Sequence, residues 1–361
     1  MKYVQRTIDN RRSLLINLAL LITSTVLALA LSEAALRVMG LEPLYVSPER
    51  DRFWKYDPLL GWAHEPGQEG IFETPEFRTN VRINAEGLRD RSHPYSRPDG
   101  RQRILVLGDS FAWGYGVEES ERFSQRLEHD LDVEVINAGV SGYSTDQELL
   151  WYENEGIKYD TDLVILVLAG NDVGDNERQL VNTIYYKPRF VLEDGQLVLT
   201  GTPVAKTSPQ GKFIYSLSQR SALVYFLTQR YFDLRALFGK MRARSNHSGS
   251  LVATTTSERE PFELTIALID KIKSIAESKN AKFMIVTTDR WWNSPEEETY
   301  QDFVTKLQSK GFPVLDVENM PGFDSEEMLI PNDGHWNQAG HEFVAQQIES
   351  AVETHKLLGQ P

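Results

Sequence analysis

The sequence contains no cysteine among its 361 residues. This absence excludes disulfide frameworks, thiolate zinc sites, iron–sulfur clusters and thiol nucleophiles together. Basic residues are also in deficit, with 38 Lys and Arg against 52 Asp and Glu, and the formal net charge is −14. A surface this acidic repels phosphate backbones at long range, so we expect no nucleic-acid partner.

Long hydrophobic runs are scarce, and the one that is present lies near the N-terminus. Residues 1–12 carry four basic side chains and one acidic one, and residues 13–32 carry no charge. Twenty helical residues span about 30 Å, which is the thickness of a bilayer core. The run exceeds the roughly 7–15 apolar residues of a signal peptide. We therefore predict an uncleaved signal anchor over residues 13–33.

The charge distribution predicts the orientation of this anchor. Basic residues before a span hold that end in the cytoplasm. A cytoplasmic tail of residues 1–12 then places everything after Glu33 on the other side of the inner (cell) membrane, in the periplasm or outside the cell. The alternative is a signal peptide cleaved near Ala30, Ser32 or Ala34, which would release a soluble protein.

The remainder of the chain divides by composition. Residues 34–100 are rich in Pro, Gly and aromatic residues, and we interpret them as a stalk and an N-terminal extension. From residue 101 to 361, helical patterns alternate with short apolar runs typical of buried parallel strands, at residues 104–107, 133–136, 163–168, 283–286 and 312–315. This alternation predicts an α/β domain with one parallel sheet covered on both faces.

Residues 178–260 interrupt the alternation. They contain a predicted hairpin that turns at Asp194 and Gly195, followed by an amphipathic helix that includes Phe213, Leu227 and Phe232. An insertion of this length in a compact domain is usually functional. A stabilising flap is the alternative.

Polar residues follow three of the predicted strands. Gly108, Asp109 and Ser110 come directly after the first strand, where open α/β sheets bind ligands. Gly142 lies in a loop after the second strand, where backbone N–H groups can face an anion. Asn171 follows the third strand, and its amide can donate to a developing oxyanion. Taken singly, Ser110 could be a structural turn residue and Asn171 a helix cap.

A histidine and a carboxylate occur together near the C-terminus, in the run IPNDGHWNQAGHEF. A serine hydroxyl needs an imidazole to remove its proton, and the imidazole needs a carboxylate to orient it. Asp333 and His335 supply both groups. Zinc binding by His335, His341 and Glu342 is the alternative, but their spacing matches no common ligand pattern, so we predict no metal site.

These four blocks, in this order, resemble those of the SGNH/GDSL hydrolase superfamily. The resemblance rests on Ser110 in Gly-Asp-Ser, Gly142 in NAGVSG, Asn171 in Gly-Asn-Asp, and His335, and it extends over residues 103–357 apart from the insertion. It implies a flavodoxin-like three-layer α/β/α sandwich with a five-stranded parallel sheet, and chemistry without a cofactor.

The resemblance also implies a role for each site residue. Ser110 would be the nucleophile, His335 the general base and Asp333 its orienting carboxylate. The oxyanion hole would consist of the Ser110 and Gly142 backbone amides with the Asn171 side chain.

One position departs from the common pattern. The family places its aspartate three residues before the histidine, where this chain has Asn332, whereas Asp333 lies two residues before it. The resulting Asp-x-His-Trp order is similar to that of polysaccharide O-acetyltransferases. The run NAEGLRD at residues 84–90 looks like that of membrane-anchored bacterial members.

We therefore predict a membrane-anchored serine esterase or lipase-type hydrolase that cleaves acyl esters, such as acetyl esters, through an acyl-serine intermediate. Its substrate would be an acyl ester or an acylated glycan. One alternative is an O-acyltransferase acting on a cell-surface polysaccharide. The other is a catalytically idle scaffold that binds glycan or a partner subunit. The sequence leaves the oligomeric state open.

Overall fold

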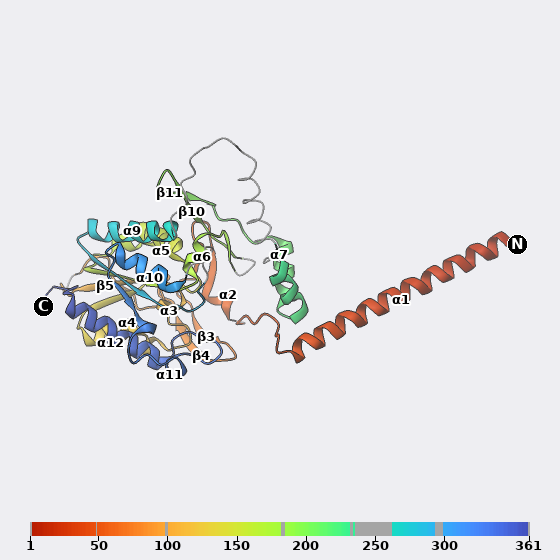
Figure 1. Ribbon diagram of the computed structural model, residues 1–361, viewed down its shortest axis with the longest axis horizontal. Helices are drawn as coiled ribbons and strands as arrows, with labels where there is room; N and C mark the ends of the chain where they lie inside the picture. Colours follow the sequence, from red (N-terminus) through yellow and green to blue (C-terminus); the bar gives the residue numbers. More distant parts are fainter. Residues whose placement is uncertain are drawn as a thin grey trace. The chain divides into compact units, whose positions relative to one another are not determined.

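The structure is a computed structural model that describes residues 2–47, 49–97, 100–181, 185–231, 234, 262–292 and 299–359, with only the backbone described for 2–12. The chain forms two compact units. Residues 1–46 and 207–254 make up the first, called the anchor unit here, and residues 47–206 and 255–361 make up the second, called the main unit. Figure 1 shows both.

A five-stranded parallel sheet forms the centre of the main unit, with strand order β13-β12-β7-β5-β6. Its strands are β5 (Arg103–Gly108), β6 (Glu134–Asn137), β7 (Leu163–Leu168), β12 (Lys282–Thr287) and β13 (Val314–Asp316). Every residue of β5 and β7 is buried, because helices cover both faces and the central strands have no solvent side. The predicted α/β fold with five parallel strands is confirmed.

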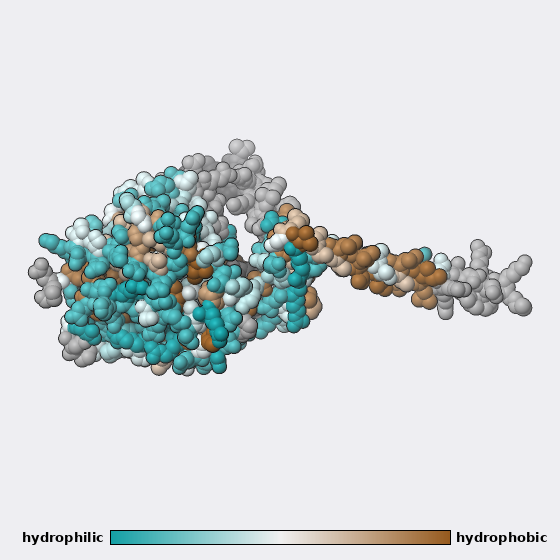
Figure 2. Space-filling model, turned by 90° about the horizontal axis from the view of Figure 1, so that it is seen from below, coloured by the Kyte–Doolittle hydropathy of each residue, from teal (hydrophilic) through white to brown (hydrophobic). Residues whose placement is uncertain are grey.

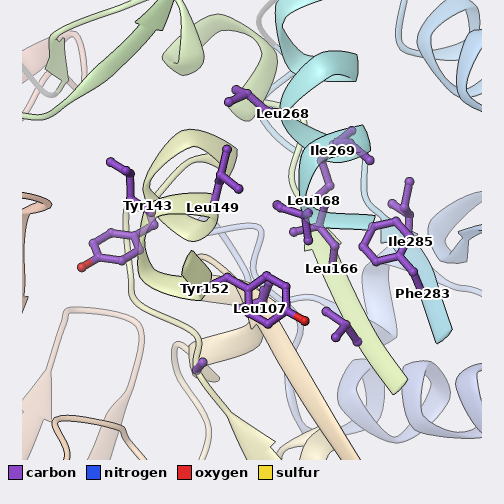
Figure 3. Close-up of a cluster of buried hydrophobic side chains, with 14 of the residues drawn as sticks. Leu107, Tyr143, Leu149, Tyr152, Leu166, Leu168, Leu268, Ile269, Phe283 and Ile285 are labelled. Carbon is purple, nitrogen blue, oxygen red and sulfur yellow. The ribbon is translucent and has the colours of Figure 1, made fainter. Parts of the chain in front are cut away.

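Alternate residues of the strands face two separate cores. Leu107 and Leu166 pack against the helices of one face, whereas Val106 and Ile165 pack against those of the other. Figure 3 shows the first of these cores. The first face carries α5 (Thr145–Asn154), α9 (Glu263–Ser278) and α10 (Tyr300–Ser309), and the second carries α4 (Phe123–Asp130) and α12 (Gln338–Thr354) (Figure 1).

Short helices connect these elements. They are α2 (Arg50–Phe53), α3 (Ser110–Trp113), α6 (Asp172–Asn176), α11 (Ser325–Met328), and the 3₁₀ turns η1 (Glu119–Glu121), η2 (Gly156–Lys158) and η3 (Val317–Asn319). Two of them, α3 and α6, begin just beyond the carboxyl ends of β5 and β7.

The N-terminal extension packs on the segment that follows β5. It forms two antiparallel pairs, β1 (Trp54–Asp57) with β2 (Gly61–His64) and β3 (Glu69–Glu73) with β4 (Arg78–Arg82). Their apolar side chains make a third core with Trp113. Arg89 is buried and donates hydrogen bonds to the carbonyl oxygens of Trp113, Gly114 and Val117. The extension therefore supports the turn after α3.

The insertion begins with two β-pairs. They are β8 (Leu180–Val181) with β9 (Tyr185–Tyr186) and β10 (Arg189–Glu193) with β11 (Gln196–Thr200). The hairpin predicted to turn at Asp194 and Gly195 is present.

The prediction of a single amphipathic helix after the hairpin is wrong. The chain forms α7 (Pro209–Ser218) and a second helix over residues 222–231. They are separate because the Ser221 hydroxyl oxygen accepts the backbone N–H of Val224 and so starts a new helix. Phe232 lies outside the described residues.

The anchor unit also contains α1 (Lys2–Val38). Its stretch Ser13–Val38 is 26 residues long, apolar enough to cross a membrane, and not buried in the protein. Figure 2 shows the surface of this stretch as predominantly hydrophobic. A helix that could span a membrane is therefore present where the sequence predicts one.

Candidate active site

Ser110 begins α3 immediately after β5 and is almost fully buried. The turn depends on Gly108, because a Cβ at this position would lie 2.7 Å from the Cβ of Ala112 and 3.0 Å from the Cβ of Val167. Asp109 caps α3, and its Oδ1 accepts the Phe111 N–H at 2.9 Å. The sharp strand-to-helix turn thus fixes the direction of the Ser110 side chain.

The loop before α12 brings His335 to Ser110. The imidazole Nε2 lies 2.7 Å from the Ser110 Oγ, and Nδ1 lies 2.5 Å from the Asp333 Oδ1. Asp333 also accepts the backbone N–H of His335 at 3.1 Å. The three side chains therefore form one hydrogen-bonded series from carboxylate to hydroxyl.

The two-residue spacing between carboxylate and histidine works because the chain turns tightly there. Asn332 and Gly334 have φ values of 62° and 96°, and the N–H groups of Asp333 and Gly334 both donate to the Ile330 carbonyl oxygen. This turn folds the Asp333 carboxylate back onto the ring of His335. In the described structure the carboxylate that contacts the imidazole belongs to Asp333, two residues before the histidine.

The pKa of Asp333 lies below its ordinary value. Burial acts to raise this pKa, but the hydrogen bond from His335 and the charge of its ring outweigh the effect of burial. Asp333 is therefore ionised at neutral pH. An ionised carboxylate at Nδ1 holds the proton on that nitrogen, and this leaves Nε2 as an acceptor for the Ser110 hydroxyl proton.

Three aromatic rings surround the imidazole of His335. Tyr115 stacks on it with ring centroids 4.3 Å apart, Phe111 lies at 5.0 Å and Trp291 at 4.6 Å, edge to face. Phe111 is buried, whereas Trp291 is 45% exposed. The sequence analysis missed Trp291, although it follows β12 at the carboxyl edge of the sheet, where ligands bind in such folds. This ring offers an apolar surface beside the His335–Ser110 pair.

The Gly142 loop follows β6, the neighbour of β5. The backbone N–H of Val140 donates to the Gly108 carbonyl oxygen at 3.0 Å. This hydrogen bond ties the loop to Gly108, two residues before Ser110. Gly142 has a φ of 83° and is exposed, and the Trp62 indole of the extension donates to the neighbouring Ser141 carbonyl oxygen at 3.2 Å. The backbone N–H of Gly139, in the same loop, already has an acceptor in the protein, because it donates to the Asn137 Oδ1 at 2.9 Å.

Asn171 follows β7 on the other side of β5 and precedes α6. Its side chain does not cap that helix, although the residue stands at the N-cap position. One amide N–H donates to the Asp175 Oδ2 at 3.0 Å, and among the described residues the second amide N–H has no acceptor. The predicted candidates Ser110, Gly142 and Asn171 thus follow three adjacent strands at one sheet edge.

A family model for the GDSL-like lipase/acylhydrolase family matches residues 106–343, which is more than half of the chain. The chain belongs to this family. The predicted SGNH/GDSL membership is confirmed, and it supports an ester-hydrolase or acyl-transfer function. No curated protein matches the chain.

Several solved structures resemble this chain at low identity. A putative lipolytic protein of the G-D-S-L family from Desulfitobacterium hafniense is 11% identical, with 68% of this chain and 99% of that chain covered and a TM-score of 0.35. A lipase/acylhydrolase from Enterococcus faecalis is 16% identical, with 70% and 96% covered and a TM-score of 0.37. A psychrotrophic esterase from Pseudoalteromonas sp. is 14% identical, with 70% and 97% covered and a TM-score of 0.37.

A buried network of hydrogen bonds centred on Glu318 holds the loop that carries His335 in place in this GDSL-family protein. Glu318 accepts hydrogen bonds from the Trp336 indole at 2.9 Å, from Arg290 Nε at 2.7 Å and from the Thr288 hydroxyl at 2.5 Å. Trp336 is fully buried. The residue after His335 is thereby fastened to the segment that follows β12. The sequence analysis did not identify Glu318, because no local pattern links it to Trp336.

Several buried carboxyl groups lie close to the turn that carries Ser110. Burial raises the pKa of Asp109 to about 6. Burial, followed by repulsion from the other acids, raises the pKa values of Glu148 and Asp172 well above the ordinary range. Burial also raises the pKa of Asp146, to about 6, although this residue pairs with the fully buried Lys187 of the insertion. Burial and mutual repulsion therefore favour the protonated forms of Glu148 and Asp172, and sequence patterns carried no sign of this cluster.

His341, part of the zinc alternative, belongs to the core. The Phe123 N–H donates to its Nδ1 at 3.3 Å, and its ring stacks on that of Phe123. Burial lowers its pKa to about 3. His341 is thus a neutral core residue that accepts a backbone hydrogen bond.

Proposed function

We propose that this protein is a serine esterase that cleaves acyl esters, with Ser110 as nucleophile, His335 as general base and Asp333 as its orienting carboxylate. The observation that carries the proposal is the unbroken hydrogen-bonded series of 2.5 Å from Asp333 to His335 and 2.7 Å from His335 to Ser110. Burial of Ser110 and His335 and the low exposure of Asp333 support it, since low exposure strengthens their electrostatic coupling.

The reaction begins when Ser110 Oγ attacks the acyl carbonyl carbon and its proton passes to His335 Nε2. Asp333 stabilises the imidazolium that forms. The carbonyl oxygen becomes an oxyanion, which accepts hydrogen bonds from the Ser110 and Gly142 backbone amides and from the free N–H of Asn171. The ester C–O bond then breaks, and His335 returns the proton to the leaving alcohol.

The acyl-serine formed in this way is resolved by water. His335 removes a proton from the water as its oxygen attacks the acyl carbon, and the carboxylic acid leaves when Ser110 Oγ recovers a proton from His335. The residues present complete both halves of this cycle by acid–base chemistry, without a cofactor.

The membrane location is part of the proposal. The 26-residue apolar stretch of α1 is long enough to cross a bilayer, and the basic residues that precede it favour a cytoplasmic N-terminus. The main unit would then act in the periplasm or outside the cell, as a domain of a single-pass protein of the inner membrane.

Acyl transfer to a cell-surface polysaccharide is the second candidate. Trp291 favours it, because an indole that is 45% exposed and 4.6 Å from His335 can stack on a sugar ring next to the acyl-serine. A sugar hydroxyl held there would replace water as the attacking group. The Asp-x-His-Trp order at Asp333 to Trp336 points the same way.

The test is hydrolysis of p-nitrophenyl esters of increasing acyl length by the full-length protein in detergent, together with labelling by a fluorophosphonate. We expect turnover and labelling of the parent and of Ser96→Ala, which alters an exposed serine. Ser110→Ala should lose both. Labelling that survives in Ser110→Ala would refute the nucleophile, and a folded parent that neither turns over esters nor labels would favour the idle scaffold.

A further inference from the structure

The two helices of the insertion are fastened to the C-terminal end of α1. The Glu33 carboxylate accepts the backbone N–H groups of Ala222 at 3.0 Å and Leu223 at 2.9 Å, and the Ser221 hydroxyl at 2.7 Å. Arg37 donates to Glu33 at 2.7 Å and to the Arg220 carbonyl oxygen at 3.2 Å. Glu33 therefore caps the helix 222–231 from the first charged position after the uncharged run.

A second backbone contact secures the other helix. The N–H of Leu44 donates to the carbonyl oxygen of Ser218 at 2.9 Å, at the end of α7. The helix pair, defined as α7 and residues 222–231, is thus held at the level where α1 changes from apolar to charged. In a protein anchored by α1, that level is the membrane–water interface.

The helix pair leaves large apolar side chains exposed. Phe213 is 64% exposed and Leu227 is 54% exposed, and Ile214 and Tyr231 are also exposed. In the part of the chain that the structure describes, every exposed large aliphatic side chain lies in the anchor unit, whereas the main unit exposes only aromatic ones, at Tyr56, Tyr95, Tyr186 and Trp291. Apolar exposure of this kind marks a surface that is covered in its working environment.

The charge of the segment is opposite to that of the protein. Residues 207–254 contain seven Lys and Arg and a single Asp, in a chain whose net charge is −14. Lys212, Arg220 and Arg230, on or next to the helix pair, are exposed. Basic segments close to a membrane are attracted to anionic lipid headgroups. A helix with apolar and basic side chains lies in the plane of the interface.

We propose that the helix pair lies in the headgroup region of the bilayer that α1 crosses, with its apolar side chains in the acyl boundary and its basic ones on anionic lipid. This inference rests on the proposed anchor. A lipid surface fits better than a second protein copy because the pair is attached to the membrane-crossing helix itself and combines apolar exposure with positive charge. By capping the helix 222–231, Glu33 then links the membrane-crossing helix α1 to the interfacial helix pair.

The test uses the absence of cysteine, which allows one label at a chosen position in the full-length protein. Phe213→Cys and Leu227→Cys report on the helix pair, Leu21→Cys on α1, and Tyr95→Cys on an exposed site of the main unit. Each variant is labelled with a polarity-sensitive fluorophore and reconstituted into phosphatidylcholine vesicles, with or without the anionic lipid phosphatidylglycerol. Quenching by lipids that carry a shallow or a deep nitroxide locates each label.

We expect shallow lipid quenching at Phe213→Cys and Leu227→Cys, deep quenching at Leu21→Cys and none at Tyr95→Cys. The shallow quenching should be stronger with phosphatidylglycerol, and Lys212→Gln with Arg230→Gln should remove most of that difference. Each variant is compared only if its circular-dichroism spectrum matches that of the parent.

Three results would overturn the proposal. Quenching at Leu21→Cys without quenching at either helix-pair label refutes the interfacial helices and leaves the anchor intact. Labels on the pair that are shielded from water, unquenched by lipid and close to labels on other copies would show that a second copy covers the surface. No quenching at Leu21→Cys refutes the anchor and the inference together.

Discussion

The imidazole Nε2 of His335 lies 2.7 Å from the hydroxyl oxygen of Ser110, although 225 residues separate them in the chain. The serine is set by the turn after β5, and the histidine by a loop that Trp336 and Glu318 fasten to the same sheet edge. Because neither residue depends on the other for its position, single substitutions can test each role in an intact fold.

Removing the imidazole should nearly abolish turnover. We expect His335→Ala to lose about 10⁴-fold or more in kcat, nearly as much as Ser110→Ala, because the members of such a set act together. Asp333→Asn should lose about 10⁴-fold, since an amide cannot hold the imidazole tautomer. Ester kinetics and the fluorophosphonate labelling rate measure both effects. Asn332→Gly, which keeps the left-handed backbone of the turn, is the matched control, and a comparable loss there would contradict the assignment of Asp333.

The oxyanion role of Asn171 has a distinct kinetic signature. Asn171→Ala removes one donor, which typically costs about 2.7–4 kcal/mol of transition-state stabilisation, and the loss should appear in kcat. Asn319→Ala, an exposed asparagine, should match the parent. If Asn171→Ala changes only KM, the residue binds the substrate ground state and is no oxyanion donor.

The buried Glu148 predicts a pH-dependent stability. Its pKa is raised in the folded state, so the unfolded state ionises first and the free energy of unfolding falls as pH rises above about 4.5. Glu148→Gln removes the free-energy cost of keeping an ionisable carboxyl group buried. We expect Tm at pH 8 to rise by about 2–4 °C, which corresponds to roughly 1 kcal/mol, and to equal the parent's at pH 4. Scanning calorimetry at both pH values measures the change in Tm, and the variant Glu353→Gln, at an exposed position, is the control. An equal rise in Tm at pH 4 would contradict the electrostatic cause.

Hydrolysis and transfer differ in what attacks the acyl-serine. In the purified protein, with an acyl donor and excess oligosaccharide, we expect mainly free acid, because a ring that is 45% exposed, as that of Trp291 is, does not shield the acyl-serine from water. Mass spectrometry distinguishes acid from acylated sugar. Acylated sugar as the main product, lost in Trp291→Ala but retained in Tyr95→Ala, would make the transferase the better description.

Protease access tests the orientation of the anchor. Protease added to spheroplasts should digest the main unit, whereas a tag at the N-terminus should survive until the membrane is opened. A mature protein that begins near Glu33 would instead show signal cleavage. The reverse protection pattern would place the main unit in the cytoplasm.

Much of the fold could be predicted from local patterns. The apolar runs marked all five strands, because strands of a parallel sheet that is covered on both faces are rich in apolar residues. Asp194 and Gly195 marked a hairpin turn through their backbone preferences. The break at Ser221 was not predictable from periodicity, since apolar residues recur at helical spacing on both sides of it and the Glu33 cap comes from 188 residues away.

The sequence by itself determined the family, the order of the strands along the chain and the identities of the candidate residues, because each depends on residue type and short-range spacing. The tertiary structure decided which groups meet. Only folding brings Tyr115 and Trp291 against His335, buries Glu148 beside other acids, and sets Glu33 on the insertion helices. Such contacts arise from packing between segments distant in the chain, and neither hydrophobic periodicity nor motif spacing encodes them.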